Sequence, residues 1–219
     1  MNKLLFLVSS NGGLLKFVYS CIEKGILSDY IISAVVADRN CGAYQFAKKK
    51  DLNCCIVKYD KHNREQLLST MRDIEFDIAI TTFYKLLDAD IVNSFVGKLI
   101  NVHPSLLPAF PGGLNASEVA LKYGVKFLGT TIHFIDEGID TGEIISQSVM
   151  PVEEDMSVDI VLDNQFRSWC LSLLNVLIRR VNEGAVDKAR NYQNSSFNPQ
   201  LCIDTDCINE EFWSELKNA

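Results

Sequence analysis

The sequence predicts an α/β fold of the Rossmann-like type, in which a mostly parallel, twisted sheet carries helices on both faces. Three observations support this fold class. The apolar runs at 4–8, 30–36 and 77–82 are nearly continuous rather than alternating, which is typical of parallel strands buried on both faces. Segments with helical spacing separate these runs. With 219 residues and 47% apolar composition, the chain is long enough to bury a sizeable core.

The elements follow in order from a strand at 4–8, a glycine-containing loop and a helix at 14–22. Further strands are expected at 30–36, 54–57, 77–82, 98–102, 127–135 and 143–149. Further helices are expected at 43–50, 64–71, 89–95, 116–122, 158–181 and 210–216. Asn115 and Glu118 have the spacing of a capping box for the helix at 116–122. The pattern weakens after residue 182, which predicts one domain over 1–182 and a short C-terminal tail over 183–219.

Composition and charge exclude several classes of partner. The formal net charge is −7 and the basic residues are scattered, whereas nucleic-acid-binding proteins concentrate them, so we expect no nucleic-acid partner. No apolar run reaches the length of a membrane span and the first is too short for a signal peptide, so we expect no membrane association and a cytoplasmic location. The seven cysteines lack the paired spacing of a metal site, which predicts reduced thiols and no metal.

The strand expected at 98–102 ends in polar residues rather than in a turn. Asn101 and His103 are two residues apart, so in a strand their side chains share one face. For an Asn-x-His pattern alone, a structural role is the commoner explanation. His133 lies among apolar strand residues and is interpreted as structural, and His62 is interpreted as a solvated loop residue.

A cluster of acidic residues in a later glycine-containing loop changes this balance. The cluster consists of Asp136, Glu137 and Asp140. A carboxylate held near an imidazole can orient the ring and stabilise its cationic form. An amide, an imidazole and a carboxylate in one cleft suit acyl transfer, because they can stabilise an oxyanion and manage a proton. No Ser or Cys nucleophile with a neighbouring base is visible, which favours direct attack by a substrate amine.

Three segments carry a resemblance to a known family. They are Asn101-Val102-His103-Pro104-Ser105-Leu106-Leu107-Pro108, Gly129-Thr130-Thr131-Ile132-His133-Phe134 and Asp136-Glu137-Gly138-Ile139-Asp140-Thr141-Gly142. With these segments the chain resembles the N-formyltransferases that use 10-formyltetrahydrofolate as co-substrate. The resemblance implies a formyltransferase fold and a catalytic domain over 1–182. It also implies catalytic roles for Asn101 and His103, which would stabilise the oxyanion, and for Asp140, which would orient His103 and help remove the amine proton.

The resemblance also implies the residues that bind the two substrates. The folate pocket would be formed by Phe83, Tyr84, Lys85, Leu86, Leu87, Ile135, Asp136, Glu137 and Gly138. The first loop resembles a glycine loop that holds a substrate phosphate at a helix N-terminus. The residues expected to bind the acceptor substrate are Ser10, Asn11, Gly12, Gly13, Pro104, Ser105 and Phe166.

The identity of the acceptor amine is a separate question. Leu14 stands where the family motif has Asn, and Phe166 stands where a substrate-binding Glu is expected. The segments 138–142 and 197–201 look closer to the sugar and tRNA branches of the family. We therefore expect a small-molecule amine, a nucleotide-linked dideoxy-amino sugar of surface polysaccharide biosynthesis. The alternatives are glycinamide ribonucleotide of purine biosynthesis and a non-catalytic folate-binding protein, and the apolar helix at 160–181 suggests a homodimer.

Overall fold

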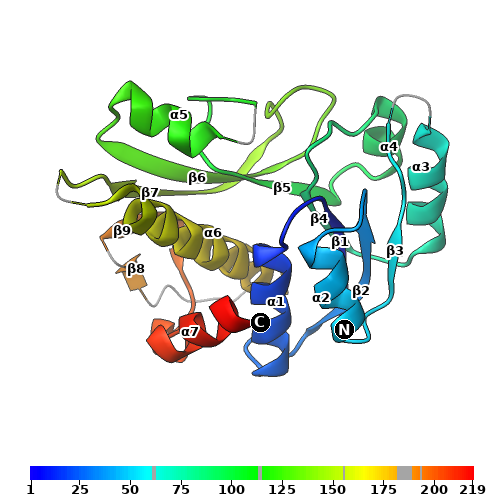
Figure 1. Cartoon of the computed structure of the whole chain (residues 1–219), viewed down its shortest axis with the longest axis horizontal. Helices are drawn as coiled ribbons and strands as arrows, with labels where there is room; N and C mark the ends of the chain where they lie inside the picture. The colour runs from blue at the N-terminus through cyan, green and yellow to red at the C-terminus, as the bar shows by residue number, and fades with distance from the viewer. Residues whose placement is uncertain (61–62, 113–114, 155, 182–188, 193) are drawn as a thin grey trace. The chain divides into compact units, whose positions relative to one another are not determined.

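The structure is a computed structural model that describes residues 1–60, 63–112, 115–154, 156–181, 189–192 and 194–219 (Figure 1). The chain divides into two compact units. The first unit comprises 1–101, 134–138 and 219, and the second comprises 102–133 and 139–218. The division falls within strand β5 (Leu99–His103), between Asn101 and Val102. The predicted domain boundary at 182/183 lies outside the described residues and stays a prediction.

The first unit contains the parallel sheet that the apolar runs predict. Its strands pair in the order β3-β2-β1-β4-β5, and every neighbouring pair is parallel. The strands before β5 are β1 (Asn2–Val8), β2 (Tyr30–Ala37), β3 (Cys54–Ile56) and β4 (Ile78–Thr82). The α/β fold class is therefore confirmed, and each predicted strand of this unit is found within three residues of its expected ends.

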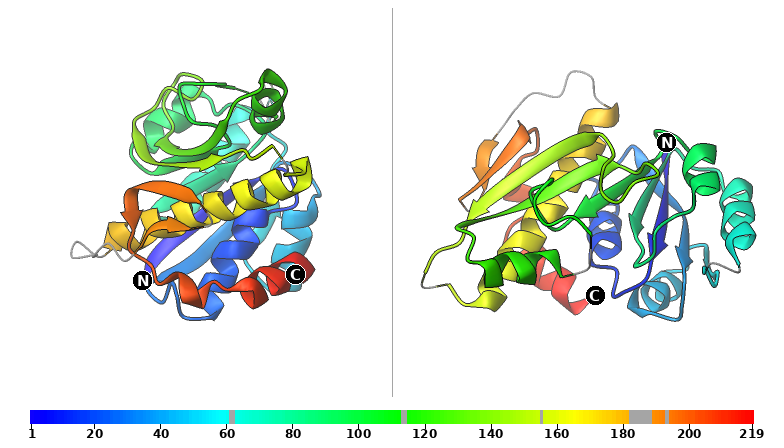
Figure 2. Two further views of the ribbon diagram at one scale, coloured as in Figure 1. Left: turned by 90° about the vertical axis from the view of Figure 1, so that its left-hand side faces the viewer. Right: turned by 90° about the horizontal axis from the view of Figure 1, so that it is seen from above.

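Helices cover both faces of this sheet. Figures 1 and 2 show α1 (Gly13–Glu23) and α2 (Gly42–Lys49) on one side and α3 (Arg64–Asp73) and α4 (Ala89–Ser94) on the other. All residues from Leu4 to Val8 are buried, which explains why this strand has no polar face. One core cluster on the α3 and α4 side joins strand residues to helix residues, among them Leu5, Leu7, Leu67, Met71 and Ile91.

The second unit contains an antiparallel sheet in the order β6-β7-β9-β8. Its strands are β6 (Phe127–Phe134), β7 (Ile144–Pro151), β8 (Ala189–Tyr192) and β9 (Ser195–Leu201). Its helices are α5 (Ala116–Tyr123), α6 (Val158–Val181) and α7 (Glu210–Asn218), with a short 3₁₀ turn at Thr205–Cys207. The sequence did not predict β8 and β9, because β9 acquires strand geometry by pairing with β7 across a long stretch of chain, and β8 does so by pairing with β9.

Two local features of the second unit bear on its stability. Asn115 precedes α5 as expected, but its side chain makes no capping hydrogen bond, so the predicted capping box is wrong. The tail helix is held by Arg167 of α6, whose guanidinium pairs with Asp163 at 3.1 Å and with Glu210 of α7. The same guanidinium lies 5.2 Å from the ring of Trp213. The tail after residue 189 is therefore folded onto α6 in this unit.

No helix among the described residues is long and apolar enough to cross a membrane. The seven cysteines are all free, and Cys207 is the one with an exposed side chain. No group of three His, Cys, Asp or Glu side chains in the described part of the chain has the arrangement of a metal site.

Candidate active site

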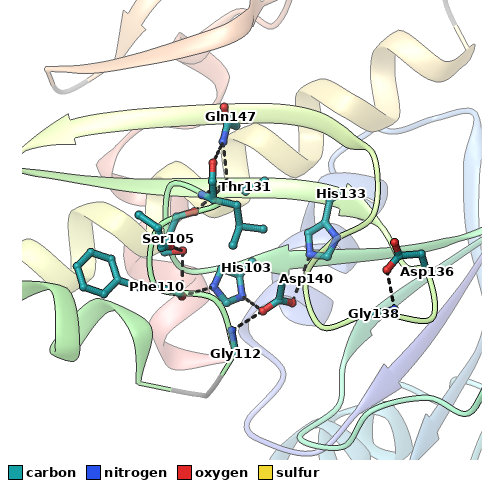
Figure 3. A network of polar contacts seen from close by, with 12 residues as sticks. His103, Ser105, Phe110, Gly112, Thr131, His133, Asp136, Gly138, Asp140 and Gln147 are labelled. Atoms are coloured by element: carbon teal, nitrogen blue, oxygen red, sulfur yellow. Dashed lines mark hydrogen bonds and ion pairs between the residues drawn. The ribbon is translucent and has the colours of Figure 1, made fainter.

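His103 lies buried at the end of β5, with 3% of its surface exposed. Its Nδ1 atom is 3.3 Å from Oδ2 of Asp140, and its Nε2 atom is 3.0 Å from the main-chain carbonyl oxygen of Phe110 (Figure 3). Both partners belong to the second unit, as His103 itself does. The structure thus brings together the imidazole and the carboxylate that the sequence placed 37 positions apart (140 minus 103).

The two contacts define where the protons of this ring lie. A main-chain carbonyl oxygen accepts hydrogen bonds and donates none, so the contact with Phe110 places a proton on Nε2. A carboxylate also only accepts, so the contact with Asp140 calls for a proton on Nδ1. Both ring nitrogens are therefore engaged, and an oxygen that develops negative charge nearby would have to replace one of these two acceptors.

Asp140 is itself held by several groups. The amide N–H of Gly112 donates to its Oδ2 at 2.7 Å, and Nε2 of His133 lies 3.6 Å from its Oδ1. The residue has a φ of 54°, in the left-handed region that non-glycine residues rarely adopt. Conformations of this kind persist where surrounding contacts fix them, and they concentrate at functional sites. The carboxylate is therefore fixed in direction as well as in place.

The turn that follows His103 is built on hydrogen bonds from β6 and β7. The hydroxyl of Thr131 donates to the carbonyl of Ser105 at 2.8 Å and accepts the amide N–H of Leu107 at 3.0 Å. Gln147 donates to the carbonyl of Leu107 at 3.0 Å and to the Thr131 hydroxyl at 3.1 Å. The Ser105 hydroxyl turns inward and donates to the carbonyl of Ala109 at 2.6 Å. These bonds fix the path of the chain between His103 and Phe110 (Figure 3).

The helix α6 supports the same turn from another direction. Gln165 is buried and donates to the carbonyl of Pro104 at 3.2 Å and to that of Gly129 at 2.9 Å. A Cβ atom added at Gly129 would lie 2.6 Å from Cβ of Leu106, closer than real Cβ atoms approach. The Gly-Thr-Thr segment of the resemblance thus has a packing role, because only glycine lets the turn approach β6 so closely. Pro104 and Ser105, both predicted to bind substrate, lie in this turn.

Asn101 precedes His103 by two residues on β5 and belongs to the first unit, where it pairs in register with Thr81 of β4. Alternation along a strand places its side chain on the same side of β5 as that of His103. The amide is partly exposed. The proposed catalytic set is therefore drawn from one strand and from the loop that carries Asp140.

The two loops predicted to bind folate both belong to the first unit. Phe83, Leu87 and Ile135 pack against the same core cluster, so the ends of both loops rest on one apolar base. Tyr84 and Leu86 are 46% and 65% exposed, which leaves an aromatic and an aliphatic side chain in solvent. The remaining residues of the second loop are turned outward, and they comprise Asp136, Glu137 and Gly138.

A tyrosine from outside these loops holds the first of them. The Tyr59 hydroxyl donates to the Asp88 carboxylate at 2.6 Å and accepts the Asp88 amide N–H at 2.8 Å. The Lys85 ammonium group donates to the Tyr59 carbonyl, and the Tyr59 ring stacks on Phe83 with centroids 6.3 Å apart. Burial, followed by the hydrogen bond to Asp88, raises the pKa of Tyr59 above its usual range. Sequence reasoning did not identify Tyr59, because its partner Asp88 is 29 residues away.

The loop predicted to hold a phosphate, Ser10–Gly13, joins β1 to α1 and packs on α2. The amide N–H of Ala43 donates to the carbonyl of Ser10 at 3.0 Å. Gly12 has a φ of 71°, and a Cβ atom there would lie 2.6 Å from Cβ of Ala43. No side chain caps the first turn of α1, so its main-chain N–H groups are not used by a capping residue.

The other predicted site residues are spread over both units. Phe166 lies in the second unit, where its ring meets that of Trp169 edge-on at 6.1 Å. His62 lies outside the described residues. The groups that sequence reasoning missed are His133 and the main-chain groups of Phe110 and Gly112. His133 was interpreted as structural because its neighbours are apolar, and the structure places it against Asp140.

The fold and this site define an α/β protein whose buried imidazole and carboxylate are arranged for transfer chemistry at a carbonyl carbon. Residues 2–168 match the formyl transferase family, and the chain belongs to that family. A phosphoribosylglycinamide formyltransferase from Mycobacterium tuberculosis is 33% identical over 158 residues, covering 68% of this chain and 71% of that protein. The chloroplastic phosphoribosylglycinamide formyltransferase of Vigna unguiculata is 32% identical over 160 residues, covering 68% of this chain.

Solved structures agree with this assignment. Glycinamide ribonucleotide transformylase 1 from Symbiobacterium toebii superposes with a TM-score of 0.76 at 26% identity, covering 87% of this chain and 92% of that one. The alignments span 51% of the length of the Vigna relative and 56% of the phosphoribosylglycinamide formyltransferase of Bacillus subtilis, about half of each. The confirmed prediction is therefore the formyltransferase family and its fold.

The comparisons correct the prediction of a nucleotide-linked amino sugar as acceptor. The relatives above are named for glycinamide ribonucleotide, the acceptor that the sequence placed second. The structure explains one source of the error. The segment at 197–201, which looked like a remnant of the sugar and tRNA branches, is part of β9 and pairs with β7, with Phe197 opposite Ser148. Its pattern of residues serves sheet pairing in the second unit.

Proposed function

We propose that this chain transfers the formyl group of 10-formyltetrahydrofolate to the amine of glycinamide ribonucleotide. The observation that carries the proposal is the buried His103–Asp140 pair, with a 3.3 Å contact, in a chain of the formyl transferase family. The names of the relatives support both the reaction and the acceptor. The exposed loop at Phe83–Leu87 is assigned to the folate co-substrate, because it presents Tyr84 and Leu86 to solvent above an apolar base.

In the proposed reaction the acceptor amine attacks the formyl carbon directly, and a new N–C bond forms. The formyl oxygen gains negative charge, which the Asn101 amide and the His103 imidazolium are suited to stabilise. In the structure the Nε2–H of His103 is donated to the Phe110 carbonyl, so it must exchange this acceptor for the developing oxyanion. The bond between the formyl carbon and folate N10 then breaks.

Proton movements complete the balance. The attacking amine loses one proton, which we assign to the Asp140 carboxylate, and the same proton then passes from Asp140 to folate N10 as it leaves. Asp140 has two roles in this scheme, because it also orients His103. The formyl group passes directly to the amine without a covalent acyl-enzyme, in agreement with the absence of a Ser or Cys nucleophile beside a base in the sequence.

The acceptor half of the site is proposed from the Ser10–Gly13 loop, Pro104, Ser105 and Phe166. Leu14 and Phe166 replace the Asn and Glu of the family motif. A panel of acceptors tests the assignment, with glycinamide ribonucleotide beside several nucleotide-linked amino sugars and a common supply of 10-formyltetrahydrofolate. Mass spectrometry should show a formyl gain on glycinamide ribonucleotide with the highest kcat/KM. A formyl gain confined to another amine would refute the acceptor, and binding of folate without any product would indicate the non-catalytic alternative.

A homodimer remains a proposal. The apolar residues in the middle of α6, such as Leu171, Leu173 and Leu174, are already buried within the chain itself. The exposed apolar residues of that helix are Val158 and Ile160 at its start. Light scattering after size exclusion would establish whether the chain associates, and the proposed reaction does not depend on the answer.

A further inference from the structure

The carboxylate of Asp140 lies between two imidazoles, and the proposed reaction uses only one of them. Its Oδ2 atom faces Nδ1 of His103 at 3.3 Å, and its Oδ1 atom faces Nε2 of His133 at 3.6 Å (Figure 3). All three residues belong to the second unit. His133 is 2% exposed, so it is as deeply buried as His103.

The pairing of β6 with β7 is irregular beside His133. Thr131 pairs with Gln147 and Ile132 with Ser146 on β7, and the register then shifts so that His133 pairs with Ile144. The extra residue at this shift is Ile145 on β7, and irregularities of this kind occur beside active sites. Here the shift falls immediately before the histidine that faces Asp140.

The two oxygens of Asp140 have different partners. Oδ2 accepts the Gly112 amide N–H at 2.7 Å and faces His103, whereas Oδ1 faces His133. Rotation about the Cβ–Cγ bond would exchange the two oxygens, and this torsion is broad in aspartate. The Asp140 side chain is only 13% exposed, so little solvent is available to replace a lost partner. At 3.6 Å the His133 contact is longer than a close hydrogen bond, and the N–H donor of the ring is the group that faces Oδ1.

We propose that His133 is a positioning residue that fixes the Asp140 carboxylate and thereby keeps Oδ2 directed at His103. This inference rests on the proposed function, because it gives His133 a part in the same reaction. His133 itself touches no reacting atom in this scheme. It acts through Asp140, whose direction sets both the orientation of the His103 ring and the point from which the amine proton is taken.

Three variants separate this role from a purely structural one. His133→Phe keeps the bulk of the ring and removes its N–H donor, and His133→Gln restores an N–H donor near the same place. Thr130→Val is the matched control, because Thr130 lies one position from Thr131 on the same strand, and among the described residues its buried hydroxyl has no hydrogen-bond partner. All three are compared by thermal unfolding before kinetics are measured.

The expected result is a fall in kcat of about 10- to 100-fold for His133→Phe, with KM for both substrates within about threefold, because misdirected catalytic groups slow the chemical step more than binding. His133→Gln should recover a large part of kcat. Thr130→Val should keep the kcat of the wild type. Equal kcat values for His133→Phe and the wild type would overturn the proposal, and so would a loss in His133→Gln as large as that in His133→Phe when both variants are folded.

A crystal structure of His133→Phe gives a readout that does not depend on turnover. The expected outcome is an Asp140 carboxylate rotated away from its contact with His103. An unchanged 3.3 Å contact between the two would overturn the proposal even if activity had fallen. If the wild type transfers a formyl group to no amine, the proposed function fails, and this structural comparison still decides whether His133 orients Asp140.

Discussion

Replacing Asp140 with Asn tests the part played by the ion pair. The change keeps the size of the side chain and leaves an oxygen that can accept the Gly112 N–H, but it removes the charge that faces His103. At 3.3 Å and an effective dielectric constant of about 20, the attraction between two unit charges is about 5 kcal/mol. Removing one partner of a buried pair costs about 3–5 kcal/mol of folding stability in measured cases, and we expect the transition state to lose a similar part of this attraction.

Since each 1.36 kcal/mol corresponds to about a tenfold change in rate, kcat should fall by about 10²- to 10⁴-fold. KM should change by less than about threefold, because Asp140 is assigned to the chemical step and not to uniform binding. The assay follows tetrahydrofolate release in the presence of glycinamide ribonucleotide, with product confirmed by mass spectrometry.

The matched control is Asp77→Asn, which alters a carboxylate that accepts the Lys3 amide at 2.8 Å in the first unit. It should keep the kcat of the wild type. A kcat for Asp140→Asn within about threefold of the wild type would refute the reasoning, because a buried charge partner of the imidazolium cannot be dispensable to the transition state that it supports.

Three further predictions concern the supports of the site. Tyr59→Phe removes both hydrogen bonds between the Tyr59 hydroxyl and Asp88. This change should raise KM for 10-formyltetrahydrofolate about 3- to 10-fold and leave kcat within about twofold of the wild type. An unchanged KM would contradict the assignment of the Phe83–Leu87 loop to folate binding. Gly129→Ala forces a Cβ to 2.6 Å from that of Leu106 and should lower the free energy of unfolding by about 1–3 kcal/mol. Each kcal/mol should lower the Tm by about 2–4 °C, and an unchanged Tm would show that the turn moves freely. Burial raises the pKa of Asp38, but hydrogen bonds from Arg39 and Ser9 outweigh it and hold that pKa below its usual range. A carboxyl with a lowered pKa stabilises the folded protein at pH values above its unfolded pKa of about 4, and this stability is lost as the pH falls. In urea unfolding, the loss in free energy of unfolding caused by Arg39→Met should therefore be largest above about pH 5 and shrink towards about pH 3. A loss that does not depend on pH would contradict this prediction.

The parallel sheet was predictable from local patterns, because strands such as β1 are buried on both faces and therefore read as unbroken apolar runs. The helix α6 begins and ends where its spacing places it. The strand β9 was not predictable, because pairing with β7 and not its own residues makes it a strand, and β8 in turn depends on pairing with β9. Long-range pairing of this kind leaves no mark at the scale of a short window of sequence.

The site shows the same difference between local and long-range information. Asn101 and His103 were recognisable at the end of β5, since a sequence records the point where an apolar strand becomes polar. His133 has the same apolar neighbours as a structural histidine, and only the folded structure brings it to 3.6 Å from Asp140. The contacts from Phe110 and Gly112 use main-chain atoms, which any residue supplies, so no sequence pattern could have revealed them.

The most direct test of formyl transfer by the His103–Asp140 pair follows the formyl carbon itself. The chain is incubated with 10-formyltetrahydrofolate labelled at the formyl carbon and with glycinamide ribonucleotide, and NMR detects the labelled carbon. The account predicts a labelled formamide on the glycinamide nitrogen with the wild type and a signal reduced by at least about 100-fold with His103→Ala. Labelled formamide produced at equal rates by both proteins, or labelled formate in place of formamide, would contradict it.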